Sequence, residues 1–304
     1  MRLLNASGCL DALAAPDVAR SFDAFVTKTV TPLPREGNAP VRIAETETGM
    51  LNAIGLANPG SEEFRSQTLP RLAGLGIPMW VSVGGFSARD YAQMCEGLDG
   101  DEVAVIELNL SCPNVDEVPE NVGEVVAAAR AATYKPLYAK LSPAVSDIAE
   151  TARAAAAAGA DGLSLVNTIR GLALDTHSLR PVLSRGAGGF SGPALRPIAL
   201  AAVYACYRAT GLPIVGMGGV ASGRDALELL AAGASDVAVG TVLFSDPAAA
   251  ERVRAELTAE LAAHGFDNPD NAVGAAHRAE RATLHPGSRV ATEKRLHIGV
   301  NMAG

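Results

Sequence analysis

Short runs of apolar residues recur along the chain, and the stretches between them are amphipathic and rich in alanine. The apolar runs do not alternate strictly with polar positions, which is the pattern of strands that are buried on both faces. Such strands are typical of parallel sheets whose strands are connected by helices. The predicted strands cover residues 2–6, 24–29, 78–83, 105–110, 136–141, 162–167, 213–217 and 236–240.

Helix-end signals mark three of the stretches between these runs. Ser87 stands directly before the amphipathic segment "ARDYAQMCEGL", where a serine caps a helix N-terminus. Residues 145–159 end in Gly159 and residues 222–233 end in Gly233, and glycine is the usual residue just past a helix C-terminus. The chain therefore alternates between strands and helices.

Eight strands separated by helices predict an α/β fold, a (β/α)8 TIM barrel, rather than an open doubly wound sheet. Residues 157–168 and 231–241 support this prediction, because both read as a helix end, a glycine, a strand and a polar tip. We expect one barrel domain over residues 1–265 and a C-terminal extension of unassigned role over residues 266–304.

Two connections are too long to be simple strand-to-helix loops. Residues 30–60 follow the second predicted strand, and residues 168–192 follow the sixth. Long ordered loops in a compact domain usually serve function, so we expect both to be active-site insertions.

Composition excludes several classes of function. Charged residues make up 19% of the chain, the net charge is −8 and the pI is near 5.2, so no nucleic-acid or anionic-membrane surface is expected. The N-terminus lacks the features of a signal peptide, and no run of about 18 apolar residues could span a membrane, so we expect a cytoplasmic protein. The spacing of the four cysteines and five histidines fits no metal-binding motif, so no metal ion is expected.

Glycines stand at the ends of the last two predicted strands. Gly218 and Gly219 follow the seventh strand, and Gly240 with Thr241 follows the eighth. In a barrel, chemistry gathers at the C-terminal strand ends, and the loops after strands seven and eight commonly bind phosphate. The alternative is that these glycines only form tight turns. Their occurrence in register on two neighbouring strands favours a phosphate site.

Lysines and asparagines occupy other strand ends. Lys28 and Lys140 lie in otherwise apolar runs, and a pair of ammonium groups beside a phosphate site indicates a cofactor with anionic character, such as a reduced flavin. A single lysine inside an apolar run is more often a surface residue, and for either lysine taken by itself this alternative stays open. Asparagine can both donate and accept hydrogen bonds, as a flat heterocyclic ligand requires. The asparagines concerned are Asn52, Asn109, Asn114 and Asn167.

Cys112 lies in the segment "NLSCPNV", directly after the strand that ends near Asn109. A lone cysteine is most often a buried structural residue, and we expect this role for Cys9, Cys95 and Cys206. Cys112 differs because polar residues of the kind that bind ligands flank it on a loop shaped by a proline. A thiolate at this position could act as a general base or as a nucleophile.

These motifs resemble the class 1 dihydroorotate dehydrogenases, which are FMN enzymes of pyrimidine biosynthesis. The stretch "AETETGMLNAIGLANPG" is most similar to the NAD-linked class 1B branch. The matching stretches, which span about residues 5–245 in order, are "NASGC", "VTKTVTPLPREGN", "AETETGMLNAIGLANPG", "ELNLSCPNV", "KLSP", "NTIRG", "GGFSGPALRPIAL" and "PIVGMGGVASGRDALELLAAGASDVAVGT".

The resemblance implies oxidation of dihydroorotate to orotate, with Cys112 as the base at C5 and hydride transfer from C6 to N5 of FMN. The residues that match the family's substrate contacts are Lys28, Asn52, Ile54, Gly55, Leu56, Asn109, Asn114, Asn167 and Thr168. The residues that match its FMN contacts are Ala6, Ser7, Gly8, Lys28, Thr29, Asn109, Lys140, Val166, Gly192, Gly218, Gly219, Gly240 and Thr241.

The resemblance also implies partners. We expect a homodimer, or a heterotetramer in which a second subunit contributes FAD and a [2Fe–2S] cluster. Three alternatives stay open from the sequence: a related FMN barrel that acts on uracil or thymine, a fumarate-linked class 1A enzyme, and a barrel that binds FMN without catalysis. An intact Cys112 and both lysines argue against the last alternative, because a binding protein has no use for a base.

Overall fold

The computed structural model describes residues 1–110 and 121–278. Eight parallel strands form one sheet in the order β1-β12-β11-β8-β7-β6-β5-β2. A parallel bridge between Leu4 and Ala24 joins the two edge strands, so the sheet closes into the predicted barrel. The barrel strands are β1 (Leu3–Asn5), β2 (Phe25–Val26), β5 (Met79–Val83), β6 (Val103–Asn109), β7 (Leu137–Leu141), β8 (Gly162–Leu165), β11 (Ile214–Met217) and β12 (Asp236–Val239).

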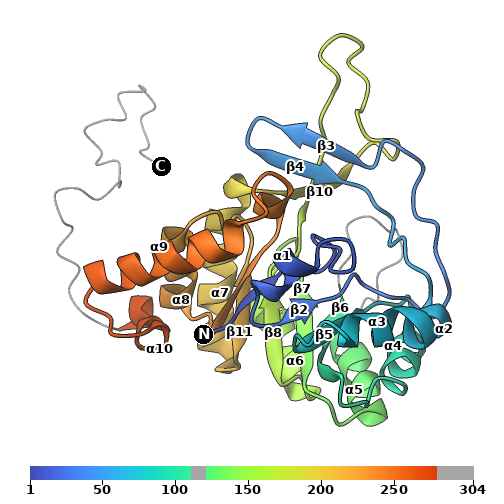
Figure 1. The fold of residues 1–304 in the computed structure, drawn as a ribbon, viewed down its shortest axis with the longest axis horizontal. Helices are drawn as coiled ribbons and strands as arrows, with labels where there is room; N and C mark the ends of the chain where they lie inside the picture. The colour runs from blue at the N-terminus through green and yellow to red at the C-terminus, as the bar shows by residue number, and fades with distance from the viewer. Residues whose placement is uncertain (111–120, 279–304) are drawn as a thin grey trace.

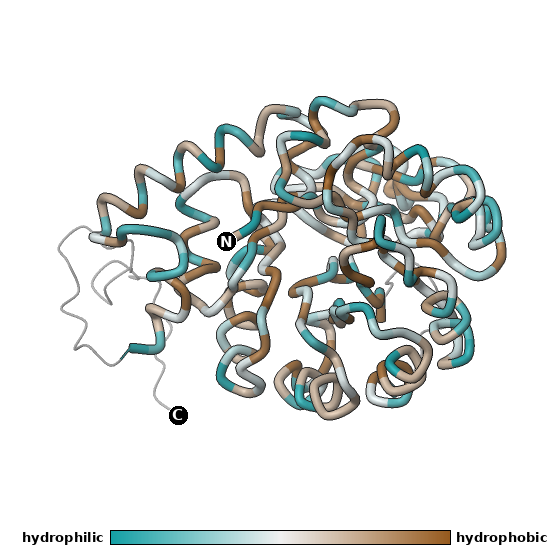
Figure 2. The backbone as a smooth tube through the Cα atoms, turned by 60° about the horizontal axis from the view of Figure 1, so that its bottom comes forward, coloured by the Kyte–Doolittle hydropathy of each residue, from teal (hydrophilic) through white to brown (hydrophobic). Residues whose placement is uncertain are grey.

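Helices surround the barrel, as alternation of strands and helices requires (Figure 1). Hydrophobic and hydrophilic residues alternate along the outer helices, whose apolar faces pack on the strands (Figure 2). The α-helices are α1 (Pro16–Arg20), α2 (Ser61–Glu63), α3 (Leu69–Ala73), α4 (Ala88–Cys95), α5 (Val122–Ala132), α6 (Ile148–Ala157), α7 (Arg196–Thr210), α8 (Gly223–Ala232), α9 (Ala249–Ala263) and α10 (Pro269–Ala272). The other helical turns are the π-helical η1 (Phe64–Thr68) and the 3-10 turns η2 (Pro193–Leu195), η3 (Thr241–Phe244) and η4 (Ala275–His277).

The predicted helix ends agree with the structure. Ser87 caps α4 in a reciprocal capping box with Asp90. Gly159 and Gly233 follow α6 and α8 with φ of 102° and 120°, a region that a residue with a Cβ rarely adopts.

The second predicted strand is shorter than the apolar run suggested. Only β2 pairs regularly, whereas residues 27–29 extend beyond the regular ladder before Val30 bridges to Val83. Lys28 and Thr29 therefore lie beyond the strand, at the end of the barrel where both line a cavity.

The two long insertions pair with each other in a way that the sequence did not predict. They contribute β3 (Ile43–Thr46) and β4 (Gly49–Asn52) from the first insertion and β9 (Ile169–Gly171) and β10 (Gly188–Ser191) from the second. These strands form an antiparallel sheet in the order β3-β4-β10-β9. This small sheet lies over one end of the barrel (Figure 1).

The opposite end of the barrel interior is filled by an aromatic and ionic cluster. The guanidinium of Arg2 pairs with Asp236 at 2.7 Å and lies 5.1 Å from the ring centre of Trp80. Trp80 also packs against Tyr138, with 4.6 Å between ring centres. These contacts close the barrel interior far from the small sheet.

The described chain continues past residue 265 in contact with the barrel. Helix α10 packs against α8, and the backbone N–H of Gly274 donates to the carbonyl of Leu230 at 2.9 Å. Residues 279–304 of the expected C-terminal extension lie outside the described residues.

Candidate functional site

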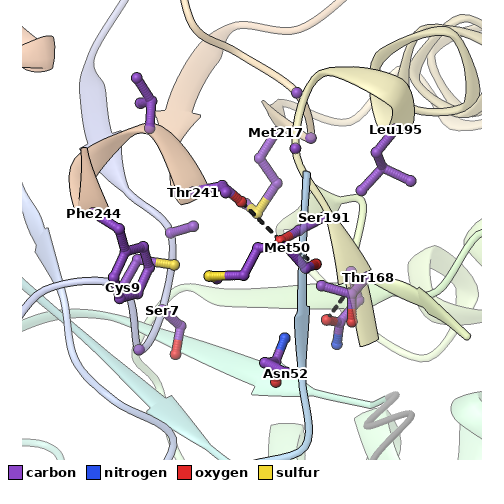
Figure 3. Close-up of a pocket in the computed structure, with 18 of the residues that line it drawn as sticks. Ser7, Cys9, Met50, Asn52, Thr168, Ser191, Leu195, Met217, Thr241 and Phe244 are labelled. Atoms are coloured by element: carbon purple, nitrogen blue, oxygen red, sulfur yellow. Dashed lines mark hydrogen bonds between the residues drawn. The ribbon is translucent and has the colours of Figure 1, made fainter. Parts of the chain in front are cut away.

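A cavity of about 410 Å³ lies between the C-terminal ends of the barrel strands and the small sheet. Side chains from both insertions and from several strand ends converge on it (Figure 3). The predicted site residues that line this cavity are Ala6, Ser7, Gly8, Lys28, Thr29, Asn52, Ile54, Leu56, Asn109, Lys140, Val166, Asn167, Thr168, Gly192, Gly218, Gly219, Gly240 and Thr241.

Among the described residues, Gly55 is the one predicted site residue that does not line this cavity. Gly55 has φ of 76°, and a Cβ placed on it would meet the backbone N and side chain of Asn38, so that side of Gly55 faces the insertion. Cys112 and Asn114 lie outside the described residues. Their roles therefore stay predictions.

The asparagines on neighbouring strand ends are linked by hydrogen bonds. Asn167 donates from Nδ2 to Oδ1 of Asn109 at 3.1 Å, and Asn109 donates from Nδ2 to Oγ1 of Thr29 at 3.1 Å. Thr29 also lies 3.0 Å from the hydroxyl of Ser82. The backbone N–H of Thr168 donates to Oδ1 of Asn167 at 2.8 Å. This chain fixes which face of each amide is directed into the cavity.

Two lysines supply positive charge to the cavity. Lys28 passes beside Gly8, where a Cβ would stand 2.9 Å from Cδ of the lysine, so the small residue makes room for this side chain. Lys140 is 6% exposed, and its Nζ lies 3.6 Å from Oε1 of the fully buried Glu107. Both ammonium groups favour an anionic ligand.

The turn after β11 consists of two glycines with positive φ. Gly218 and Gly219 have φ of 117° and 76°, and a Cβ on Gly219 would stand 2.8 Å from the backbone N of Arg196. Only glycine fits this conformation and this spacing. The turn therefore brings bare backbone to the cavity, as a phosphate site requires.

The start of helix α8 is occupied by the protein's own acids. Glu256 accepts from the N–H of Gly223 at 2.8 Å, and this hydrogen bond lowers the pKa of the carboxyl below its ordinary value. Asp225 accepts from the N–H of Ala221 at 2.9 Å, and Arg252 donates to the Ala221 carbonyl at 2.9 Å. An anion in the cavity would therefore meet the glycine turn before the helix, and not the first turn of α8 itself.

Several cavity residues were missed by the sequence analysis. They are apolar or small, and such residues give no chemical signal unless the fold places them at a site. Met50 and Ile43 reach the cavity from the β3–β4 hairpin, and Ser191 from β10 accepts from Thr241 at 2.8 Å (Figure 3). Phe244, which is 54% exposed, lies at the cavity in η3.

The three described cysteines are poor bases. Burial raises the pKa of Cys95 and of Cys206 to about 12. Cys9 is only partly buried and lines the cavity, so the expectation of a buried structural cysteine is wrong for this residue. Desolvation nevertheless raises the pKa of its thiol, although the charges of Lys140 and Lys28 act in the opposite direction. Thiols with raised pKa values stay protonated near neutral pH, and only the thiolate accepts a proton.

Comparisons with known proteins agree with this arrangement. The family model described as dihydroorotate dehydrogenase matches residues 2–261. The chain belongs to the dihydroorotate dehydrogenase family. It is 47% identical over 263 residues to the protein named dihydroorotate dehydrogenase B (NAD(+)), catalytic subunit, of Desulforudis audaxviator, covering 84% of this chain and 86% of that protein. It is 40% identical over 285 residues to the protein of that name from Halalkalibacterium halodurans, covering 90% and 93% of the two chains.

Solved structures agree on the fold. A dihydroorotate dehydrogenase of Eimeria tenella in complex with ferulenol superposes with a TM-score of 0.78 at 24% identity, covering 91% of this chain and 85% of that one. The ligand-free form from the same organism gives a TM-score of 0.77, also at 24% identity, covering 91% of this chain and 89% of that one. The resemblance to the NAD-linked branch is confirmed, and the family's main activity is favoured over the pyrimidine-reducing and fumarate-linked alternatives.

None of the helices in residues 1–110 and 121–278 is long and apolar enough to cross a lipid bilayer.

Proposed function

We propose that this protein is the FMN-binding catalytic subunit of an NAD-linked dihydroorotate dehydrogenase, oxidising dihydroorotate to orotate in pyrimidine biosynthesis. The observation that supports this most is a single cavity that joins both lysines, the linked asparagines and the glycine turns, in a chain of this family. Orotate is a flat anion whose ring carries alternating carbonyl and N–H groups, so amides and ammonium groups are its natural partners.

The residues of the cavity fit FMN. The positive-φ turn at Gly218 and Gly219 brings bare backbone to the cavity wall, where backbone N–H groups can approach a phosphate and a side chain on Gly219 would collide with Arg196. Lys140, buried at the end of β7, would lie against the flavin ring and favour negative charge there. When bound, FMN supplies a hydride acceptor at N5 for the hydrogen on C6 of dihydroorotate.

The protein's own residues then bind, orient and deprotonate the substrate. Lys28 would pair with the substrate carboxylate. Asn109 and Asn167 line the cavity, and the hydrogen bonds between Asn167, Asn109 and Thr29 fix the orientation of both amides, which would then hold the substrate ring. Cys112 would take the proton from C5 as a thiolate. Loss of that proton together with the C6 hydride leaves the C5–C6 double bond of orotate, so atoms and electrons balance.

The relatives are named as catalytic subunits of an NAD(+) enzyme, which supports a second subunit for NAD⁺. We infer that this partner holds FAD and a [2Fe–2S] cluster, and that the assembly is a homodimer or a heterotetramer.

The proposal is tested with the purified chain. It should take up one FMN, and dihydroorotate should bleach that flavin without oxygen. NAD⁺ should reoxidise it rapidly only after the proposed partner is added. A well-folded chain that takes up no FMN contradicts the cofactor, and fast NAD⁺ reduction by the chain alone contradicts the partner.

Replacement of Cys112 separates the base from the binding residues. Cys112→Ala should slow flavin reduction by dihydroorotate about 10²- to 10⁴-fold, the usual contribution of a general base, and should still bind orotate. The rate of the parent should rise between about pH 6 and about pH 9, because a free thiol ionises near pH 8.5. Cys9→Ala is the matched control, because Cys9 also lines the cavity. Loss of reduction in Cys9→Ala, with Cys112→Ala unaffected, would overturn the assignment.

A further inference from the structure

Glu107 is a buried acid at the middle of the barrel with no assigned role. It is 1% exposed, it lies on β6, and it is not among the residues that line the cavity. Its Oε1 has no hydrogen-bond partner among the residues that the structure describes. A buried carboxylate is costly unless a charge compensates it, so its neighbour defines its role.

That neighbour is Lys140. The strand register places Glu107 beside Tyr138 and Lys140 beside Asn109. Since side chains alternate along a strand, and Val105 and Tyr138 both belong to the cluster that fills the barrel, Glu107 and Lys140 also point inward. Oε1 of Glu107 lies 3.6 Å from Nζ of Lys140, so the acid stands directly behind the lysine that faces the cavity.

Both members of the pair are buried, Glu107 at 1% exposed and Lys140 at 6% exposed. Ser164, in register with Lys140 on the next strand, is fully buried, and its hydroxyl also has no partner among the described residues. In such an interior, charges act over longer distances than in water, because little solvent screens them. The charge of Glu107 therefore reaches whatever ligand Lys140 touches.

We propose that Glu107 is the counter-charge of Lys140, and that the two charges together, and not the lysine alone, determine the electrostatic potential at the flavin end of the cavity. This rests on the proposed function, because it assumes that a flavin lies against Lys140. A lone ammonium would bind the reduced, more anionic flavin far more tightly than the oxidised one. The carboxylate behind it weakens this preference and keeps the reduction potential of the bound flavin lower.

Glu107→Gln isolates the charge. Glutamine has nearly the same shape as glutamate, so the packing around Lys140 is kept while the negative charge 3.6 Å from its Nζ is removed. The ratio of affinities for reduced and oxidised FMN should rise about tenfold, which is about 30 mV more positive for a two-electron couple. The measurement is the midpoint potential of bound FMN by anaerobic spectroelectrochemistry, together with the Kd of oxidised FMN.

Two control variants separate charge from repacking. Ser164→Ala changes a buried neighbour without changing charge, and Glu102→Gln removes an exposed acid next to the other end of β6. Both should leave the potential unchanged. A purely structural role for Glu107 would weaken both redox forms equally, so an unchanged or more negative potential in Glu107→Gln overturns the proposal.

A second comparison covers the case in which Glu107→Gln does not fold. Lys140→Met leaves the carboxylate unpaired, whereas Lys140→Met combined with Glu107→Gln removes both charges, a change that buried pairs often tolerate. The double variant should have the more positive potential, and equal potentials overturn the proposal. Failure of the parent to bind FMN would instead contradict the proposed function.

Discussion

Thr29→Val tests whether the hydrogen-bond chain across the strand ends orients the substrate. Thr29 is 2% exposed and accepts from the side-chain amide of Asn109 at 3.1 Å. Valine keeps the shape of threonine but cannot accept, so the amide loses a buried partner at a cost of about 1–3 kcal/mol. Asn109 can regain a partner by rotating its amide out of the orientation that binds the substrate. The Kd of orotate should then rise about 5- to 100-fold, because about 1.4 kcal/mol corresponds to a factor of ten.

The same substitution two residues earlier is a matched control. Thr27 is also 2% exposed, and its hydroxyl accepts from the backbone N–H of Ser82 at 3.1 Å, outside the asparagine chain. Both variants should lose about 1–2 kcal/mol of unfolding free energy in urea, but only Thr29→Val should lose orotate affinity. Orotate binding is read from the absorbance of the bound flavin. Equal orotate affinity in the two variants would refute the reasoning.

Two further predictions concern the glycine turn and the buried thiols. Gly219→Ala should weaken FMN binding at least tenfold and should weaken riboflavin binding less, because riboflavin has no phosphate. Gly211→Ala is the control: Gly211 has φ of 66°, but no atom lies within 4 Å of a Cβ placed on it. This control variant should lose about 1–2 kcal/mol of stability and should keep its affinity for FMN. Equal losses of both ligands would argue against a phosphate at this turn. Cys95 and Cys206, whose pKa values are raised to about 12, should stay unlabelled by iodoacetamide in the folded protein up to about pH 10, and labelling below that pH would contradict their burial.

Local sequence signals determined much of the barrel. Apolar runs, serine N-caps and glycines after helices are short-range features, and they predicted the eight strands and helices such as α4 and α8. The predicted strand over residues 24–29 was too long, because an apolar pattern does not reveal where the backbone leaves a ladder. The motifs at strand ends also predicted most of the cavity lining, since parallel strands in a barrel bring their C-terminal ends together.

Contacts between distant segments were decided only by the tertiary structure. The β4–β10 pairing joins insertions whose polar, glycine-rich sequences have no strand periodicity, so neither insertion predicts its partner. Glu107 sits inside an apolar run, and nothing local reveals that Lys140 stands 3.6 Å away. Met50 and Phe244 likewise line the cavity only because the fold brings their segments to it, and nothing in the sequence around them indicates this. The sequence determines which residues are buried and which can do chemistry, whereas closure of the barrel determines which of them meet.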